Sequence, residues 1–141
     1  IANDGRYTPP SLIRGTISPT GTFRPFPTPS GIKVLGAATT RQMREMLEGV
    51  VVSGTGTKAA VEGYAVAGKT GTAQKPMKDQ RGYGDDYTSI FAGFVPASAP
   101  QITIVVVLDE PKDHSASRAV APLFADIATE TLAAIGVPET G

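Results

Sequence analysis

The chain of 141 residues contains no cysteine, and neither sign of charge is in excess. Without cysteine it has no disulfide, no thiolate nucleophile and no cysteine-ligated metal. Thirteen Lys and Arg balance thirteen Asp and Glu, so no net field favours nucleic acid or an anionic membrane surface as a partner. The longest apolar run, residues 104–108, is far shorter than the roughly 20 residues that span a bilayer. Binding is therefore expected at a local site, and any membrane anchor is expected outside this chain.

The apolar content, 40% of the residues with mean hydropathy near zero, is typical of a soluble globular domain with its own core. The chain begins with Ile rather than Met, so we expect it to be a piece of a longer protein. Glycine and proline are frequent, and the prolines cluster near the N-terminus. Residues 1–31 are therefore predicted to be an extended, loop-rich segment.

Residues 40–52 have the spacing of an amphipathic helix, which Thr39 or Thr40 can cap. The outer side of this helix is predicted to be solvated and to hold ion pairs between residues four apart, Arg41 with Glu45 and Arg44 with Glu48. Its inner side, predicted to lie in the core, consists of Met43, Met46, Leu47, Val50 and Val51.

Residues 119–135 are predicted to form a second helix, with Pro122 in its first turn and Gly136 as its C-cap. Three strand-like segments precede this helix. The last two, residues 87–95 and 101–108, are separated by a short turn and should form an antiparallel hairpin. The final strand is almost continuously apolar, so it is predicted to be covered on both faces. This order of loop, helix, strands and helix predicts an α+β fold. The three strand-like segments are residues 60–73, 87–95 and 101–108.

Residues 63–70, GYAVAGKT, match the phosphate-binding pattern G-x-x-x-x-G-K-[ST]. A phosphate-binding loop needs a glycine-rich turn followed at once by the start of a helix. Here the inner residues of the match favour a strand, and no helical period follows Thr70. We therefore reject the nucleotide-binding interpretation and place the overlapping KTGT in a strand.

In such a strand Thr70 and Thr72 lie on one side and Lys69 on the other, so a site that uses all three must lie along the strand's edge. Gly71 has no Cβ and allows another chain to approach the backbone closely. An edge with free N–H groups, two hydroxyls and one ammonium suits a peptide-like ligand that ends in a carboxylate. K-[ST]-G alone is a weak signal, because it arises by chance in roughly one chain of this length in fifteen.

The wider surroundings are more specific. GTGTKAAVEGYAVAGKTGTAQKP, YTSIFAGFVPASAPQITIVVVLDEP and AVAPLFADIATETL resemble the last part of the transpeptidase domain of class B penicillin-binding proteins, and the septal, cell-division type above all. The resemblance implies that residues 1–141 are the C-terminal part of one domain with a β-lactamase/transpeptidase-like fold. In that fold an antiparallel sheet, with three strands in residues 60–108, is flanked by helices.

The resemblance also implies a function, that of a peptidoglycan cross-linking serine D,D-transpeptidase without a cofactor. A serine would attack the D-Ala-D-Ala end of a stem peptide, and an amine of a neighbouring stem peptide would take the acyl group. β-Lactam antibiotics would intercept that serine. Other implied partners are divisome membrane proteins, and the implied location is extracytoplasmic, with an anchor in the cytoplasmic membrane outside this chain. No nucleic acid partner and no metal are expected.

Residue roles follow from the same resemblance. Lys69 would hold positive charge in the cleft, and Thr70 and Thr72 would bind the carboxylate of the substrate or the β-lactam. Gly71 would keep the strand edge clear, and the Thr72 N–H would form half of the oxyanion hole. Two further residues are candidates for lining the cleft: Tyr83, within the polar loop of residues 76–86, and Tyr87, directly after it.

No nucleophile is assigned in this chain. The first two family motifs, S-x-x-K and S-x-N, are expected in an N-terminal part of the same domain, which is missing or is a separate polypeptide, so the chain alone is not expected to be active. Residues 112–118 replace the Gly-rich aromatic stretch that is common in the family, which puts an aromatic wall of the cleft in doubt. His114 in this loop is expected to be solvated. The adjacent Asp109 and Glu110 are expected to point to opposite faces and not to cooperate.

Two other classes of function remain open. One is a D,D-carboxypeptidase or serine β-lactamase of the same fold. The other is a non-catalytic module that binds peptides or β-lactams through the same cleft.

Overall fold

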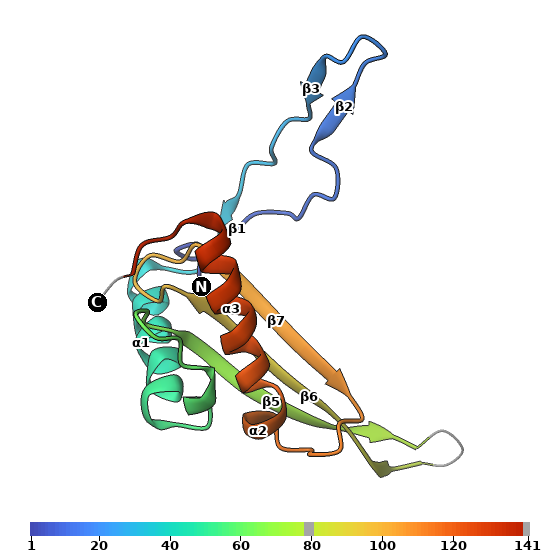
Figure 1. Ribbon diagram of the computed structural model, residues 1–141, viewed down its shortest axis with the longest axis vertical. Helices are drawn as coiled ribbons and strands as arrows, with labels where there is room; N and C mark the ends of the chain where they lie inside the picture. The colour runs from blue at the N-terminus through green and yellow to red at the C-terminus, as the bar shows by residue number, and fades with distance from the viewer. Residues whose placement is uncertain (78–80, 140–141) are drawn as a thin grey trace.

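A three-stranded antiparallel sheet forms the centre of the protein in the computed structural model, which describes residues 1–77 and 81–139 (Figure 1). Its strand order is β5-β6-β7, and β6 and β7 form the predicted hairpin. The polar loop between β5 and β6 includes residues 78–80, which lie outside the described residues. The α+β prediction is therefore confirmed. The strands are β5 (Ala67–Pro76), β6 (Tyr83–Val95) and β7 (Ile102–Asp109).

The first strand begins later than its apolar pattern suggests. A short 3-10 helix, η1 (Thr57–Ala59), precedes the predicted segment, and an isolated bridge between Val61 and Tyr64 lies near the start of that segment. The Tyr64 hydroxyl donates to the backbone carbonyl of Val137, 2.7 Å away. Residues 60–66 thus approach the end of the last helix before the chain enters the sheet.

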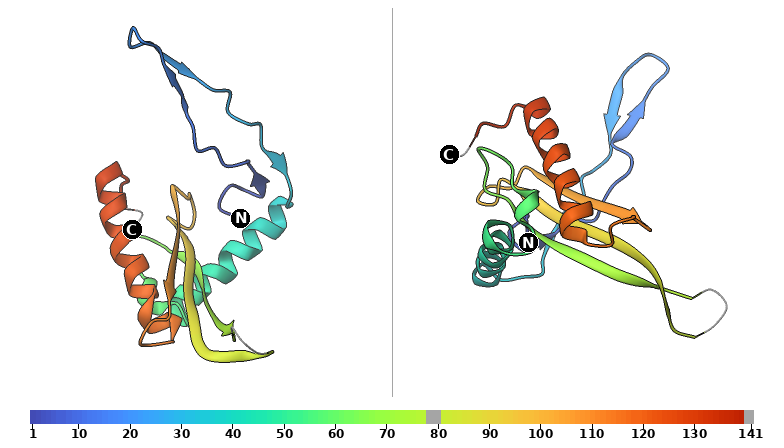
Figure 2. Two further views of the ribbon diagram at one scale, coloured as in Figure 1. Left: turned by 90° about the vertical axis from the view of Figure 1, so that its right-hand side faces the viewer. Right: turned by 60° about the horizontal axis from the view of Figure 1, so that its bottom comes forward.

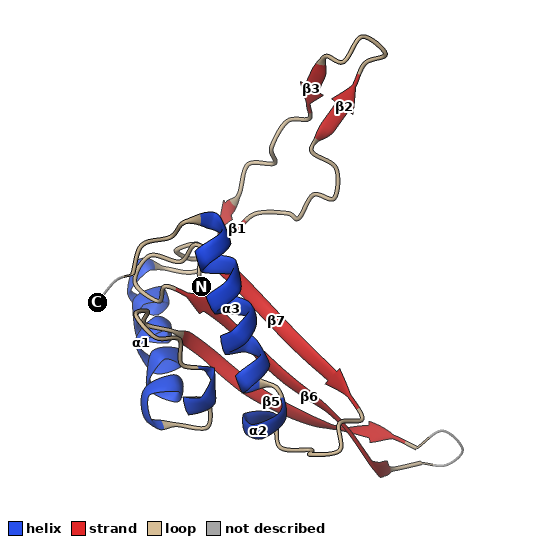
Figure 3. Ribbon diagram, in the orientation of Figure 1, coloured by secondary structure: helices blue, strands red, loops and turns tan. Residues whose placement is uncertain are grey.

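Helix α3 (Ala121–Ile135), preceded by the short α2 (Ala116–Ala119), packs on one face of the sheet (Figures 2 and 3). Pro122 lies in its first turn, and Gly136 ends it in the left-handed conformation, as predicted. The rings of Phe91 and Phe124 meet in the core with centroids 4.7 Å apart. The core around them is aliphatic and fully buried: Val95, Val120, Ala128 and Leu132.

The prediction that β7 is covered on both faces is wrong for the described residues. Exposure alternates along this strand, and Val105 and Val107 are 59% and 54% exposed. Ile104, Val106 and Leu108 pack against the core on the side of α3. The apolar pattern is continuous, but the helices of this chain cover β7 on one face only.

Helix α1 (Ala37–Ser53) lies beside β5 and begins before the predicted start. Neither threonine caps it, because Gly36 occupies the N-cap position and the Thr40 hydroxyl donates back to the Gly36 carbonyl, 3.0 Å away. Met46 is 59% exposed rather than in the core. Only a narrow side of the helix is covered, with Thr40 and Val51 as its buried residues.

The N-terminal segment projects away from the body as a long arm (Figure 1). Two short antiparallel ladders order it: β1 (Arg6–Tyr7) pairs with β4 (Ile32–Lys33), and β2 (Gly15–Ile17) pairs with β3 (Phe23–Pro25). These short strands lie largely in the segment that the sequence predicted to be loop-rich. Each has only two or three residue pairs, too short to leave a clear periodic signal.

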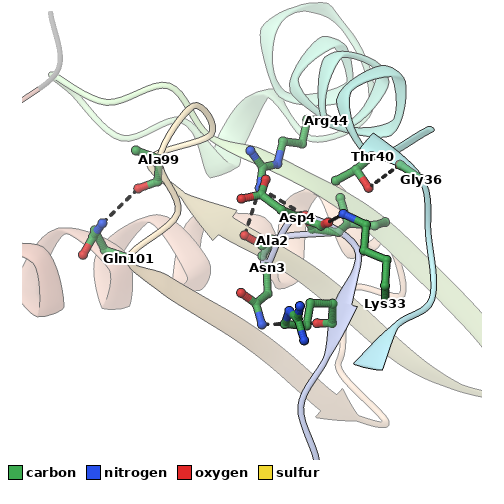
Figure 4. Close-up of polar contacts among 11 residues, drawn as sticks. Ala2, Asn3, Asp4, Lys33, Gly36, Thr40, Arg44, Ala99 and Gln101 are labelled. Atoms are coloured by element: carbon green, nitrogen blue, oxygen red, sulfur yellow. Dashed lines mark hydrogen bonds and ion pairs between the residues drawn. The ribbon is translucent and has the colours of Figure 1, made fainter. Parts of the chain in front are cut away.

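Arg44 attaches the base of the arm to α1 (Figure 4). Its guanidinium donates to the Asp4 carboxylate at 2.7 Å and to the backbone carbonyl of Ala2 at 3.0 Å. Lys33 donates to the Asp4 carbonyl, 2.8 Å away. The predicted solvated pair of Arg44 with Glu48 is therefore wrong, because Arg44 points toward the N-terminal segment.

Candidate functional site

The KTGT residues lie on β5, which is an outer strand of the sheet formed by the described residues. Thr70 and Thr72 pair with Phe91 and Ser89 of β6, on the face that packs against α2 and α3. Lys69 lies on the opposite face. Its ammonium nevertheless reaches the edge, where it donates to the Thr70 carbonyl at 2.8 Å and approaches the Thr70 hydroxyl at 3.2 Å.

An open pocket of about 270 Å³ lies along this edge. The structure thus brings together Lys69, Thr70, Gly71 and Thr72, all of which the sequence singled out. Four lining residues were missed as site residues, and each belongs to a stretch that the sequence did mark: Thr55 to the GTG block, and Ser115, Ala116 and Ser117 to the atypical 112–118 loop. The complete lining is Thr55, Lys69, Thr70, Gly71, Thr72, Ser115, Ala116 and Ser117.

Gly71 has space beside it. A Cβ atom at this position would meet only the Ile90 Cβ, at 3.8 Å, which is an ordinary van der Waals distance. Packing within the described chain therefore does not require glycine at this position.

The Thr55 hydroxyl lies 2.8 Å from that of Thr70, and either group can donate. Thr55 follows the end of α1, where the N–H groups of Gly54 and Gly56 both donate to the carbonyl of Val50. A Cβ at Gly56 would lie 3.2 Å from the Phe91 ring, so this glycine lets the turn pack closely on the core. Thr55 is thus held by a short, well-anchored turn.

Asp113 organises the loop that forms the opposite wall of the pocket. Its carboxylate accepts from the Arg118 side chain at 2.6 and 3.0 Å and from the Ser115 N–H at 3.0 Å. The bonds from Arg118, and next that from Ser115, lower the pKa of Asp113 to about 2. They leave the Ser115 and Ser117 hydroxyls 2.9 Å apart, facing the pocket.

His114 is exposed, in line with the sequence interpretation, and its ring packs on that of Tyr87 with centroids 4.6 Å apart. The loop is tied to the sheet below it, because the buried Ser89 hydroxyl donates to the His114 carbonyl at 2.9 Å. Tyr83 is 67% exposed and pairs with Pro76 near the far end of the β5–β6 ladder. The described lining of the pocket includes neither Tyr83 nor Tyr87, so a cleft-lining role for them remains a prediction.

Asp109 and Glu110 do come together, contrary to expectation. Lys75 donates to both, at 2.9 Å from an Asp109 oxygen and 2.7 Å from a Glu110 oxygen. β7 ends at Asp109, and Glu110 has φ of 50°, so strand alternation no longer applies. The bond from Lys75 holds the pKa of Asp109 below its usual value, and the two carboxylates raise the pKa of Lys75. This exposed ion-pair cluster is separate from the KTGT pocket.

One S-x-x-K match does occur in the chain, Ser30 to Lys33, which sequence reasoning overlooked. That motif needs a helical turn to bring its serine and lysine together. Here Ile32 and Lys33 form β4, and Lys33 is bonded to the backbone of Asp4 at the base of the arm. The match therefore lacks the geometry of a nucleophile site.

Within residues 1–77 and 81–139, no helix is long and apolar enough to cross a membrane. Over the same residues, no group of three or more His, Cys, Asp or Glu side chains could hold a metal ion. The polar groups that line the KTGT pocket are hydroxyls, one ammonium and backbone amides.

An antiparallel sheet with a helix on one face and KTGT on its outer strand is the arrangement expected of a β-lactamase/transpeptidase-like fold. A family model for the penicillin binding protein transpeptidase domain matches residues 1–129. The chain belongs to this family, and its relatives place it with the class B penicillin-binding proteins.

Individual relatives agree with this assignment. Penicillin-binding protein PbpB of Mycolicibacterium smegmatis is 42% identical over 98% of this chain and 23% of its own length. A probable peptidoglycan D,D-transpeptidase, PbpC of Pseudomonas aeruginosa, is 38% identical over 98% of this chain and 23% of its own length. The chain thus spans less than a quarter of either relative.

A solved structure is also similar. Penicillin binding protein 3 of Mycobacterium tuberculosis, complexed with aztreonam, superposes with a TM-score of 0.87 at 38% identity. The match covers 99% of this chain and 34% of that one. The predicted fold class is therefore confirmed.

Proposed function

We propose that this chain is the KTGT-bearing part of a serine D,D-transpeptidase that cross-links peptidoglycan, of the septal, cell-division type. The observation that carries the proposal is the edge of β5, where Lys69, Thr70 and Thr72 border one open pocket. A free strand edge with an ammonium and hydroxyls suits an extended peptide that ends in a carboxylate. The name of PbpC as a probable peptidoglycan D,D-transpeptidase supports the same reaction.

In this proposal Thr70 and Thr72 donate hydrogen bonds to the terminal carboxylate of the stem peptide, and Lys69 attracts it by charge. The backbone N–H of Thr72 stabilises the negative oxygen of the tetrahedral intermediate. Gly71 leaves the strand edge clear for the substrate backbone, a role supported by the open space beside it. The attacking serine comes from the rest of the protein.

β-Lactams are proposed to bind the same pocket through the same carboxylate contacts. The aztreonam complex of the M. tuberculosis relative supports this proposal. Divisome membrane proteins as partners, an extracytoplasmic location and anchoring to the cytoplasmic membrane are proposed from the class B relationship.

The apolar outer face of the sheet supports a further part of this proposal. On the face opposite α3, Val107 pairs with Ile90 and Val105 pairs with Ala92, and the two valines leave exposed apolar surface there. We assign this surface to contact with the remainder of the domain, which carries S-x-x-K and S-x-N.

The test is Lys69→Ala in the complete protein, with acylation by a fluorescent penicillin as the measurement. Removal of a charge that assists both binding and the transition state is expected to slow acylation by about 100-fold or more. Lys58→Ala is the matched control, because Lys58 is an exposed lysine of η1 outside the pocket lining. Equal acylation of wild type and Lys69→Ala would contradict the proposed role.

The reaction itself is tested with stem peptides. A cross-linked product with release of D-Ala supports a transpeptidase. Release of D-Ala without cross-links would instead indicate a D,D-carboxypeptidase, and rapid turnover of penicillin a β-lactamase.

A further inference from the structure

The hydroxyl of Thr70 has more than one neighbour. A hydroxyl offers one donor hydrogen and two acceptor positions. The Lys69 ammonium, which can only donate, approaches the Thr70 oxygen at 3.2 Å and so takes one acceptor position. The Thr55 hydroxyl lies at 2.8 Å and can take either the second acceptor position or the donor hydrogen.

We infer that Thr55 is a positioning residue that sets Thr70 as a hydrogen-bond donor to the carboxylate of the ligand. A carboxylate only accepts, so Thr70 must give its single hydrogen to it. The bond between Thr55 and Thr70 then persists only if Thr55 donates. When Lys69 and Thr55 both donate to the Thr70 oxygen, the Thr70 hydroxyl hydrogen remains to be donated to the carboxylate of the ligand. This inference rests on the proposed function.

The resulting chain runs from the Thr55 hydroxyl through the Thr70 hydroxyl to the carboxylate. Hydrogen bonds in such a chain polarise and strengthen one another. The turn of residues 54–56 gives Thr55 a defined position, since Gly54 and Gly56 both bond to Val50 and Gly56 lies against the Phe91 ring. Thr55 needs no contact with the ligand to act in this way.

The experiment uses the complete protein and a penicillin in two forms, with a free carboxylate and as its methyl ester. Thr55→Val keeps the shape of the side chain and removes the hydroxyl. We expect it to raise the dissociation constant of the noncovalent complex by about tenfold for the free carboxylate, the effect of one hydrogen bond that assists a charged group. The limiting rate of acylation and the binding of the ester should change little.

Two matched variants accompany it. Thr55→Ser keeps the hydroxyl and should behave like wild type. Thr57→Val makes the same chemical change two residues away, outside the pocket lining, and should also behave like wild type. If Thr55→Val fails to fold, Thr55→Ala provides the same comparison with a smaller side chain.

Unchanged binding of the free carboxylate in Thr55→Val would overturn the inference. A loss of equal size for the methyl ester, or an equally impaired Thr55→Ser, would also overturn it, because either result indicates a general change of shape. A wild-type protein that penicillin does not label overturns the proposed function and this inference with it. Labelled wild type beside an unaffected Thr55→Val overturns this inference alone.

Discussion

Asp113 lies outside KTGT, yet its carboxylate accepts the hydrogen bonds that hold the loop forming the opposite wall of the pocket. The side chain of Arg118 and the N–H of Ser115 bond to the charged carboxylate, which lowers its pKa from 3.8 to about 2. A carboxyl whose pKa is lower in the folded protein contributes stability above its unfolded pKa. That contribution is lost as the pH falls from about 4 through about 2. The Asp113 side chain is partly exposed, so salt should weaken its ion pair with Arg118 and reduce this contribution to stability.

We therefore predict that Asp113→Asn lowers the stability of the complete protein near neutral pH and that the difference from wild type disappears between about pH 4 and pH 2. Urea unfolding at a series of pH values measures it. Differences that stay constant down to pH 2 would contradict the assignment of the stabilisation to the ionised form. In the acylation assay, the variant should also bind penicillin less well, because Ser115 and Ser117 lose their anchored loop.

At the scale of the element, the packing of α3 on the sheet requires two residues without side chains. A Cβ at Gly93 would lie 2.9 Å from the Ala67 carbonyl and 3.0 Å from the Phe124 ring. A Cβ at Gly68 would lie 2.6 Å from the Phe91 ring. These two glycines are paired across β5 and β6, so the aromatic rings rest directly on the backbone of the sheet.

Gly93→Ala is predicted to destabilise the complete protein by about 1–3 kcal/mol, because the added methyl overpacks the contact with Phe124. Gly49→Ala is the matched control. Gly49 lies within α1, and a Cβ there meets nothing within 4 Å, so this change should stabilise by about 0.5–1 kcal/mol. Chemical denaturation measures both. The prediction fails if the two substitutions shift the unfolding free energy in the same direction.

At the scale of the whole molecule, the sheet has one face covered by α2 and α3 and one face with exposed valines on β7. We predict that Val105→Asp lowers the melting temperature of the complete protein by several degrees, because a charge would enter the contact proposed for the rest of the domain. Val105→Ile keeps an apolar β-branched residue at the same site and should leave the melting temperature nearly unchanged. Equal melting temperatures for all three proteins would show that this face is not covered.

Much of the fold and part of the candidate site could be predicted because the signals are local in sequence. The 3.6-residue period marked both helices, and Gly136 and Pro122 marked the ends of α3. KTGT was noticed as a short motif within characteristic neighbours. Met46 and Arg44 were misplaced, since a helical period shows which side is apolar but not how wide the covered side is or what lies beside it.

The sequence by itself determined the family, the α+β order of elements and the strand that carries Lys69, Thr70 and Thr72. Each of these features can be recognised from motifs and periodicities along the chain. Only the tertiary structure decided that Thr55, Ser115 and Ser117 border the same pocket, and that Lys69 reaches the Thr70 hydroxyl from the opposite face. These contacts join residues of separate elements or of opposite sheet faces, so their distances depend on how the helices and the sheet pack and not on any local pattern.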